Sequence, residues 1–385
     1  MKTPRLDTLI LTAALGAFTL AGCGTSSGQS NNDTDAAVDS PDGGSEADTG
    51  GDPTGEAVLD PSHFLADGLT APIEEVPCTL SNGDETTCYK VSVVGEPKDH
   101  EIGPFCPRNV SDGPEAAGIW LEGGEVYDAD GAFIAGLAEF YEDPNWQLHD
   151  EATGVIRVTE TLEACEAAAR PDVAEEYQNY CVECDLEDLG GAVAAEYLIP
   201  KVPVPRATAG ELGGTTSVGV ALNGAFFDPP APVAAILGAY TIAAFDDCGG
   251  HVNPVAGYHY HAATGCSKEI AQDDAHAPLI GYALDGYAIH SMSAEGGEEP
   301  GDLDSCRGHS DDARGYHYHS ASPGENMFIG CFHGEVVGTV DDGPGGGGGG
   351  GMDVITCDDV PDGMPCCGDD VCDGPETAAN CAEDC

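Results

Sequence analysis

The chain has 385 residues, and its 69 acidic and 12 basic side chains give a formal net charge of −57. Such a surface repels phosphates and anionic headgroups, so it argues against nucleic acid as a partner and against adhesion to lipid surfaces. Cations are its natural partners, although solubility is the plainer explanation of the charge. Without Cys23, the 17 cysteines leave an even 16, which predicts disulfides in an exported protein.

Residues 1–22 have the features of a secretory signal peptide. Lys2 and Arg5 precede an apolar run at 9–20 that is too short to span a bilayer. The ending Leu-Ala-Gly-Cys resembles the bacterial lipobox, in which the signal is cleaved before the cysteine and lipid is attached to Cys23. We therefore expect an exported lipoprotein held by its lipid alone, with ordinary secretion and a spare Cys23 thiol as the alternative. Gly24 lacks the aspartate that retains some lipoproteins in the inner membrane, so we expect the outer membrane, with the protein facing the periplasm or the cell surface.

Composition divides the rest of the chain into four parts. Residues 23–56 contain eight carboxylates and no lysine or arginine, which predicts a lipidated cysteine followed by a disordered acidic tether. Residues 57–340 have the composition of a folded domain, and a glycine-rich linker follows at 341–352. Residues 353–385 form a cysteine-rich tail, too short to build a core without disulfides.

Within residues 57–340, β-branched and aromatic residues near Gly, Pro or Asp predict strands at 91–94, 155–158, 218–222, 240–245 and 336–340. The Ala/Glu-rich stretch 159–170 predicts a helix, with Thr159 and Thr161 as possible caps, and a weaker helix is expected at 173–180. The sequence thus indicates a mainly β fold with a minor helical segment.

Four short blocks occur twice in the same order. The pairs are ALNG at 221 and ALDG at 283, DDCGGH at 246 and DSCRGH at 304, GYHYH at 257 and 315, and Gly-Cys at 265 and 330. The spacing from Cys248 to Gly257 equals that from Cys306 to Gly315. This pattern predicts an internal duplication, with a repeated core at 217–335 that forms a pseudo-two-fold unit.

Each repeated YHYH motif has the spacing of a metal-binding strand. Side chains alternate across a strand, so the two histidines of a motif share one face and its two tyrosines share the other. Imidazoles at positions i and i+2 suit a transition metal, with Cu or Zn expected first. If the two halves meet at their dyad, the ligand set would be His259, His261, His317 and His319, with His251 and His309 at matching positions as further ligands. The alternative is a metal-free hydrogen-bond network that holds the two halves together.

Cysteines and aspartates flank both motifs. The simplest disulfide pairing is Cys248 with Cys266 and Cys306 with Cys331, with crossed pairing and thiolate ligation as alternatives. Asp246, Asp285 and Asp304 stand at or near repeated positions, where they are expected to form turns or to support the histidines. The pair Cys181 and Cys184 could be a redox motif, but the neighbouring Cys165 favours structural disulfides.

The blocks VGVALNGAFFD, FDDCGGH, GYHYH, HAPLIGYALDGYAIH, DLDSCRGH and IGCFHG resemble the YHYH-domain family of exported bacterial proteins over residues 217–335. The resemblance implies a shared fold unit and no particular reaction. His290 departs from the family pattern and is left out of the ligand set. The end of the tail, CCGDDVCDGPETAANCAEDC, resembles short cysteine-rich modules of myxobacterial surface proteins.

Three functions are compatible with these features. The first is a cell-envelope protein that binds and buffers a transition metal. The second is a metal-dependent hydrolase or oxidoreductase at the same histidines, with an open coordination position. The third is a metal-free surface interaction module. Neither a nucleotide-binding loop nor a serine nucleophile elbow occurs in the sequence, so no nucleotide cofactor is expected.

Overall fold

The computed structural model describes residues 58–170, 173–212, 217–294 and 296–338. The expected signal peptide, Cys23, acidic tether, glycine-rich linker and cysteine-rich tail lie outside these residues. No helix in the described part of the chain is long and apolar enough to cross a membrane.

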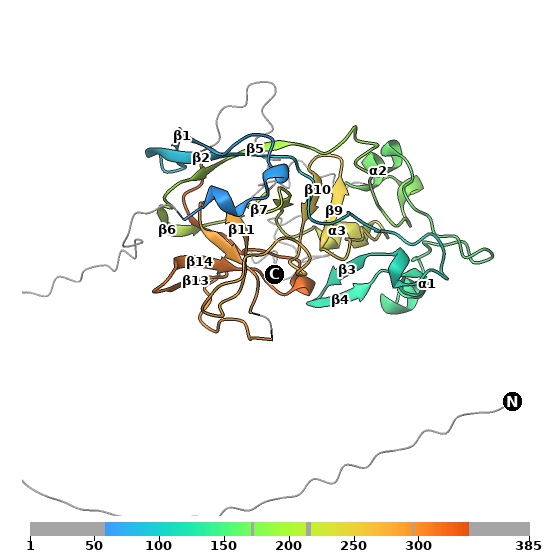
Figure 1. Cartoon of the computed structure of the whole chain (residues 1–385). Coiled ribbons are helices and arrows are strands. Elements are labelled where there is room, and N and C mark those ends of the chain that lie inside the picture. The colour runs from blue at the N-terminus through green and yellow to red at the C-terminus, as the bar shows by residue number, and fades with distance from the viewer. Residues whose placement is uncertain (1–57, 171–172, 213–216, 295, 339–385) are drawn as a thin grey trace, which may run out of the picture. The chain divides into compact units, whose positions relative to one another are not determined.

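The fold is mainly β, as the sequence predicts (Figure 1). The three α-helices are α1 (Gly131–Phe140), α2 (Leu162–Ala168) and α3 (Val233–Gly238). The first strands are β1 (Glu74–Thr79), β2 (Glu85–Val93), β3 (Ile119–Glu122), β4 (Glu125–Asp128), β5 (Ala195–Pro200), β6 (Pro205–Gly210), β7 (Gly219–Ala221) and β8 (Phe226–Phe227). The remaining strands are β9 (Gly250–Asn253), β10 (Gly257–Tyr260), β11 (Leu279–Ala283), β12 (Ala288–His290), β13 (Gly308–Asp311), β14 (Gly315–His319) and β15 (Phe332–Gly334).

Eight strands form the central sheet, in the order β13-β14-β12-β11-β7-β8-β10-β9. The antiparallel pair β7 and β11 lies in the middle, and Figure 1 shows the two YHYH strands, β10 and β14, on opposite sides of that pair. On each side the YHYH strand pairs in parallel with a short strand, β8 or β12, and antiparallel with an outer strand, β9 or β13. The two halves of the sheet therefore repeat the same order of strand pairings.

The tyrosine faces of the motifs pack into the protein. Tyr258, Tyr260 and Tyr318 are at most 1% exposed and belong to the largest apolar cluster. The other face of the sheet centre, around Val220 and Tyr282, packs against the three-stranded sheet β1-β2-β5. Burial on both sides fixes the strand register, because a slip of one residue would exchange every histidine with a tyrosine.

A separate apolar cluster forms around the β3–β4 hairpin and α1. Asp130 caps α1 by accepting a hydrogen bond from the Phe133 backbone (2.8 Å), and Ile134 and Leu137 face the core. Trp120 and Trp146 are both buried in this cluster.

The predicted helix at 159–170 is present but shorter, as α2, and Thr161 caps it through the Ala164 backbone (3.2 Å). The weaker helix at 173–180 is one 3₁₀ turn, Glu175–Tyr177. Strands are present within 91–94 and 218–222. The predictions at 155–158 and 240–245 are wrong, because these segments form isolated bridges to single residues and no continuous ladder. Of the predicted strand at 336–340, residues 336–338 are described and contain one isolated bridge, from Val337 to Leu80, while 339 and 340 lie outside the described residues.

Five disulfides staple the described residues. Cys248–Cys266 and Cys306–Cys331 confirm the pairing expected around the motifs, and Cys78–Cys88 joins β1 to β2. Cys106–Cys181 and Cys165–Cys184 show that the Cys-x-x-Cys residues pair with distant partners and not with each other. Both therefore have a structural role.

Candidate metal centre

Two hairpins, β9–β10 and β13–β14, present the histidines. Gly257 and Gly315 begin the YHYH strands with φ near +69° and +65°, a left-handed conformation that suits glycine. Across each hairpin the first motif histidine lies directly opposite the matching upstream histidine, His259 opposite His251 and His317 opposite His309. The three histidines of each hairpin thus gather on one face of the sheet, as the alternation predicts.

In the β13–β14 half, a fourth histidine completes a compact set that we call the four-histidine group: His276, His309, His317 and His319. Its Nε2 atoms lie close together, with separations of 3.0 Å from His276 to His317, 3.1 Å from His309 to His317 and 3.2 Å from His319 to His309. A tetrahedral ion with metal–nitrogen bonds of about 2.0–2.1 Å would separate its ligands by about 3.3–3.4 Å. The group is close to that geometry.

The outer nitrogen of each of these rings donates a hydrogen bond to an oxygen. The acceptors are Ala277 O for His276 (2.9 Å), Asp302 Oδ1 for His309 (2.9 Å), Gly315 O for His317 (3.0 Å) and Ser291 O for His319 (3.0 Å). A carbonyl or carboxylate oxygen can only accept, so each Nδ1 carries a proton and each ring turns its Nε2 toward the others. This is the arrangement that fixes histidine ligands around a metal.

Protonation is unfavourable for three of these four rings, because they are buried and close together. Burial, followed by the neighbouring histidines, lowers the pKa of His317 to about 4. The pKa of His319 falls to about 3, with burial again the largest cause, and burial also lowers the pKa of His276. At neutral pH these three rings are therefore uncharged, with their Nε2 lone pairs directed into the group.

The sequence reasoning missed His276 and set His290 aside. His276 lies in the loop before β11, outside the repeated blocks, so no matched partner identified it. His290 ends β12, and its ring lies 4.6 Å from the His276 ring between centroids. Its Nδ1 donates to Ala277 O (2.8 Å), the carbonyl that also accepts from His276 Nδ1. His290 therefore packs behind the group and is not one of its members.

In the β9–β10 half, His251, His259 and His261 form the three-histidine group. The centroid distances between its rings are 4.6, 4.9 and 5.0 Å, against 4.6, 5.0 and 5.2 Å for the matching rings of the other half. His259 Nδ1 donates to Gly257 O (2.9 Å), as His317 does to Gly315 O. Burial lowers the pKa of His251 and of His261 well below the usual value. The two halves thus build closely similar histidine triads.

The expectation that the six predicted histidines converge on one dyad is wrong. Four strands separate β10 from β14 in the sheet order, and at about 4.8 Å per strand the two groups lie on the order of 20 Å apart along the sheet. The strands β7 and β11 pair at the centre of the sheet, and the YHYH strands lie outside them. Any metal chemistry therefore belongs to two separate groups.

The aspartates that flank the motifs accept hydrogen bonds from the motif tyrosines. Tyr258 donates to Asp246 Oδ2 (2.9 Å) and Tyr316 donates to Asp304 Oδ2 (2.9 Å), while both carboxylates also accept backbone hydrogen bonds in the turns before β9 and β13. Asp285 accepts from Tyr318 and from the Gly334 backbone (2.9 Å). These aspartates therefore form the expected turns, and they support the motifs by accepting hydrogen bonds from the motif tyrosines.

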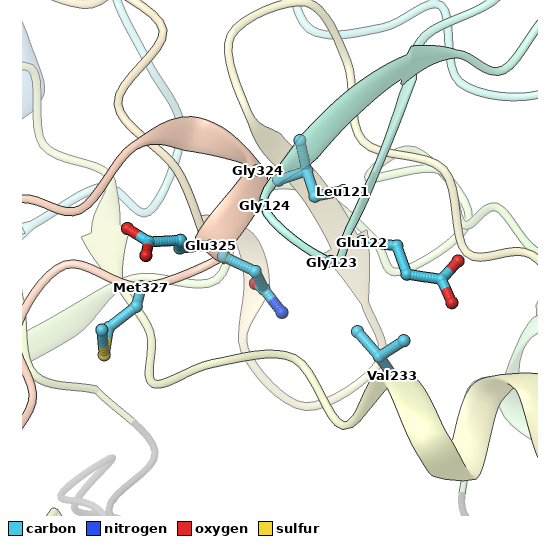
Figure 2. A pocket seen from close by; sticks show the side chains of 9 residues that line it. Leu121, Glu122, Gly123, Gly124, Val233, Gly324, Glu325 and Met327 are labelled. Carbon is cyan, nitrogen blue, oxygen red and sulfur yellow. The ribbon is translucent and has the colours of Figure 1, made fainter. Parts of the chain in front are cut away.

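A cavity of about 380 Å³ lies elsewhere, between the β3–β4 turn, the start of α3 and the 3₁₀ turn Pro323–Glu325 (Figure 2). Its lining contains no histidine, and its carboxylates have neighbours of their own: Glu122 accepts from Trp120 Nε1 (2.9 Å) and Glu325 from Ser322 Oγ (3.2 Å). A third cluster, His100 with Cys248 and Cys266, has both sulfurs in a disulfide and so offers no thiolate ligand.

Comparison with known proteins gives one match. The family model described as YHYH protein matches residues 196–297, from β5 to just beyond β12. The matched segment includes the three-histidine group, His276 and His290, and it ends before β13. No curated protein and no solved structure matches the chain.

Proposed function

We propose that this protein is an exported cell-envelope protein that binds and retains one transition metal ion, Zn²⁺ or copper, at the four-histidine group. The observation that carries the proposal is the convergence of four Nε2 atoms whose rings have their Nδ1 protons directed outward, onto oxygen acceptors. Imidazole nitrogen suits zinc and copper better than magnesium or calcium, which prefer oxygen ligands.

A metal-free network explains this geometry less well. A hydrogen bond between two imidazoles needs one donor and one acceptor, but here the protons are committed to outward hydrogen bonds. His317 and His319 are 0% and 1% exposed, so water does not readily separate the lone pairs. The four nitrogen lone pairs repel one another, and a metal ion bound among them would replace that repulsion with four coordination bonds.

The number of ligands favours retention over catalysis at this group. Four protein nitrogens fill a tetrahedral shell, whereas catalytic zinc sites generally keep one position for water or substrate. Buffering, storage or structural use of the ion is therefore the role that the geometry supports, and a hydrolase or oxidoreductase at this group is disfavoured.

The exported location is part of the proposal. Residues 1–23 have the sequence of a lipoprotein signal and its cysteine, which would anchor the protein to the envelope by lipid, with the outer membrane preferred. Five disulfides among the described residues support an oxidising compartment.

The test is metal content by elemental mass spectrometry on protein purified from its own cell envelope. We expect one or more equivalents of zinc or copper in the wild type, with the ion of the four-histidine group lost from the His317→Ala, His319→Ala variant. His149→Ala, which removes an imidazole outside both groups, is the matched control. A wild-type protein that holds no metal, and takes up neither zinc nor copper on challenge, would overturn the proposal and favour a metal-free surface module.

A further inference from the structure

Asp228 lies beside the three-histidine group, at the position that His290 occupies in the other half. Phe227 pairs with Tyr260 of the first motif, and Ile289 pairs with Tyr318 of the second. The next residues along those strands are Asp228 and His290. The three-histidine group, which has no fourth histidine, therefore has a carboxylate at its border.

This carboxylate is buried, and among the described residues it has no lysine or arginine as partner. Asp228 is 7% exposed, and one of its oxygens, Oδ1, accepts a hydrogen bond from Ser217 Oγ (3.1 Å). Among the described residues no lysine or arginine forms an ion pair with it. A buried carboxylate without a compensating charge is costly, and such groups are commonly paired or bound to a metal.

The other oxygen faces Nε2 of the first motif histidine, His259. Asp228 Oδ2 lies 3.6 Å from His259 Nε2, which is beyond hydrogen-bond length. His259 Nδ1 donates to Gly257 O (2.9 Å), and the Asn253 side-chain amide lies 3.4 Å from His259 Nε2, which leaves Nε2 as the acceptor nitrogen of the ring. Two electron-pair donors thus face each other at a separation close to that of neighbouring ligands on one ion.

A second observation comes from His261. This residue is 5% exposed, and its Nδ1 makes no hydrogen bond of full geometry among the described residues, although an interaction with the Pro229 backbone opposes the lowering of its pKa by burial; Nδ1 of the matching His319 donates to Ser291 O (3.0 Å). A buried polar atom without a partner costs about 1–3 kcal/mol and commonly marks a place for an ion or a water molecule. The three-histidine group therefore has one buried nitrogen, His261 Nδ1, that lacks a well-formed hydrogen bond.

We propose that the three-histidine group binds a second metal ion, separate from the four-histidine site, and that the Asp228 carboxylate completes its coordination shell. Asp228 Oδ2 is near His259 but is not within 4.8 Å of every ligand atom of the group, so the side chain shifts toward the ion on binding. A shell of three imidazoles and one carboxylate suits divalent Zn²⁺ or Co²⁺ and disfavours Cu⁺, which prefers soft ligands. This site stands independently of the proposed function of the four-histidine group.

The first experiment counts tightly bound Co²⁺ on the full mature chain, by equilibrium dialysis and by visible absorption of the bound ion. We expect two equivalents in the wild type and one in Asp228→Asn, whose second equivalent is weakened about a hundredfold with a changed absorption band. The isosteric amide keeps the Ser217 contact available, so the variant is expected to fold. Two tight equivalents with an unchanged spectrum in Asp228→Asn would overturn the role of Asp228.

A pair of variants separates this proposal from that of the four-histidine group. His276→Ala with His319→Ala removes ligands of the four-histidine group, and we expect it to keep one Co²⁺ that Asp228→Asn then weakens. His251→Ala with His261→Ala should lose that ion and keep the one at the four-histidine group. If His251→Ala with His261→Ala keeps every equivalent that the wild type binds, the second site does not exist, whatever the result at the first.

Discussion

The two halves of the central sheet contain the same triad of histidines with different surroundings. In the β13–β14 half, His276 supplies a fourth nitrogen and His290 stands behind the group. In the β9–β10 half, no fourth histidine joins the group, and Asp228 takes the place of His290. One scaffold therefore presents a group of four histidine nitrogens on one side and a group of three with a carboxylate neighbour on the other.

This difference shows which part of the motif is general. The strand pairings, the positive-φ glycines and the Tyr–Asp hydrogen bonds recur in both halves. Gly250 and Gly308 recur as well, since a Cβ at either position would collide with the hydroxyl of the motif tyrosine. The YHYH hairpin thus positions three imidazoles, and residues outside the motif decide what the triad binds.

The largest expected effect comes from removing the fourth nitrogen, His276, which only the β13–β14 half has. His276→Ala should weaken Zn²⁺ at the four-histidine group by about a hundred- to a thousandfold, since zinc binding of about 10–16 kcal/mol shared by four ligands gives about 2.5–4 kcal/mol to each. Competition with a chromophoric chelator measures the affinity. His290→Ala is the matched control, and less than a tenfold loss is expected because His290 supplies no ligand atom to the group. Equal losses in the two variants would contradict a four-nitrogen shell.

A buried aspartate makes the halves differ in their response to pH. Asp285 is fully buried where the other half has Asn223, and burial raises its pKa to about 6 from 3.8. Below pH 3.8 both folded and unfolded states hold the proton, and as pH rises to about 6 the unfolded state releases it first. Stability therefore falls across this window, and above it the wild type bears a penalty of about 3 kcal/mol.

Asp285→Asn should remove that dependence. We expect the free energy of unfolding of the variant, relative to wild type, to increase by up to about 3 kcal/mol from about pH 4 to about pH 7. Urea unfolding with the disulfides intact measures it. The reciprocal Asn223→Asp should show the opposite trend, and a difference between Asp285→Asn and wild type that is independent of pH would argue against an ionised Asp285 in the folded protein.

The same Tyr–Asp contact is buried in one half and accessible in the other. Tyr258 and Asp246 are 0% and 1% exposed, whereas Asp304, the partner of Tyr316, is exposed. Tyr258→Phe should cost about 1–3 kcal/mol, because it leaves a buried carboxylate with one donor fewer, and Tyr316→Phe about 0.5 kcal/mol, because water replaces the lost donor. Thermal unfolding of the two variants compares them, and equal losses would show that exposure does not decide the cost.

Local features of the halves could be predicted from the sequence. Alternation placed His317 and His319 on one face, and the matched spacing of Cys306 and Cys331 indicated their disulfide. Both depend on geometry within one hairpin. The mainly β character follows in the same way from short stretches rich in β-branched and aromatic residues.

The separation of the two groups could not be predicted, because strand order depends on which strands pair across the dyad. β7 and β11 contribute three and five buried residues to the centre of the sheet, and this burial places the YHYH strands on the outside. His276 reaches its group from a loop, without any periodic signal. Asp228 did have a signal: aligning ALNGAFFD with ALDGYAIH places it opposite His290.

The smallest expected effect concerns the one ligand of the four-histidine group that is oriented by a side chain. His309 Nδ1 donates to Asp302 Oδ1 (2.9 Å), whereas the other three rings donate to backbone carbonyls that no substitution removes. Asp302→Asn should therefore weaken Zn²⁺ by about tenfold, at the low end for outer-shell contacts, because the Asp302 side chain is 73% exposed and water can take its place. The same chelator competition measures it, with Asp312→Asn, an exposed carboxylate outside the group, as the control. A loss as large as that of His276→Ala would mean that Asp302 fixes the charge of the site as well as the orientation of His309, and the four-histidine group would then depend on a carboxylate as the three-histidine group is proposed to do.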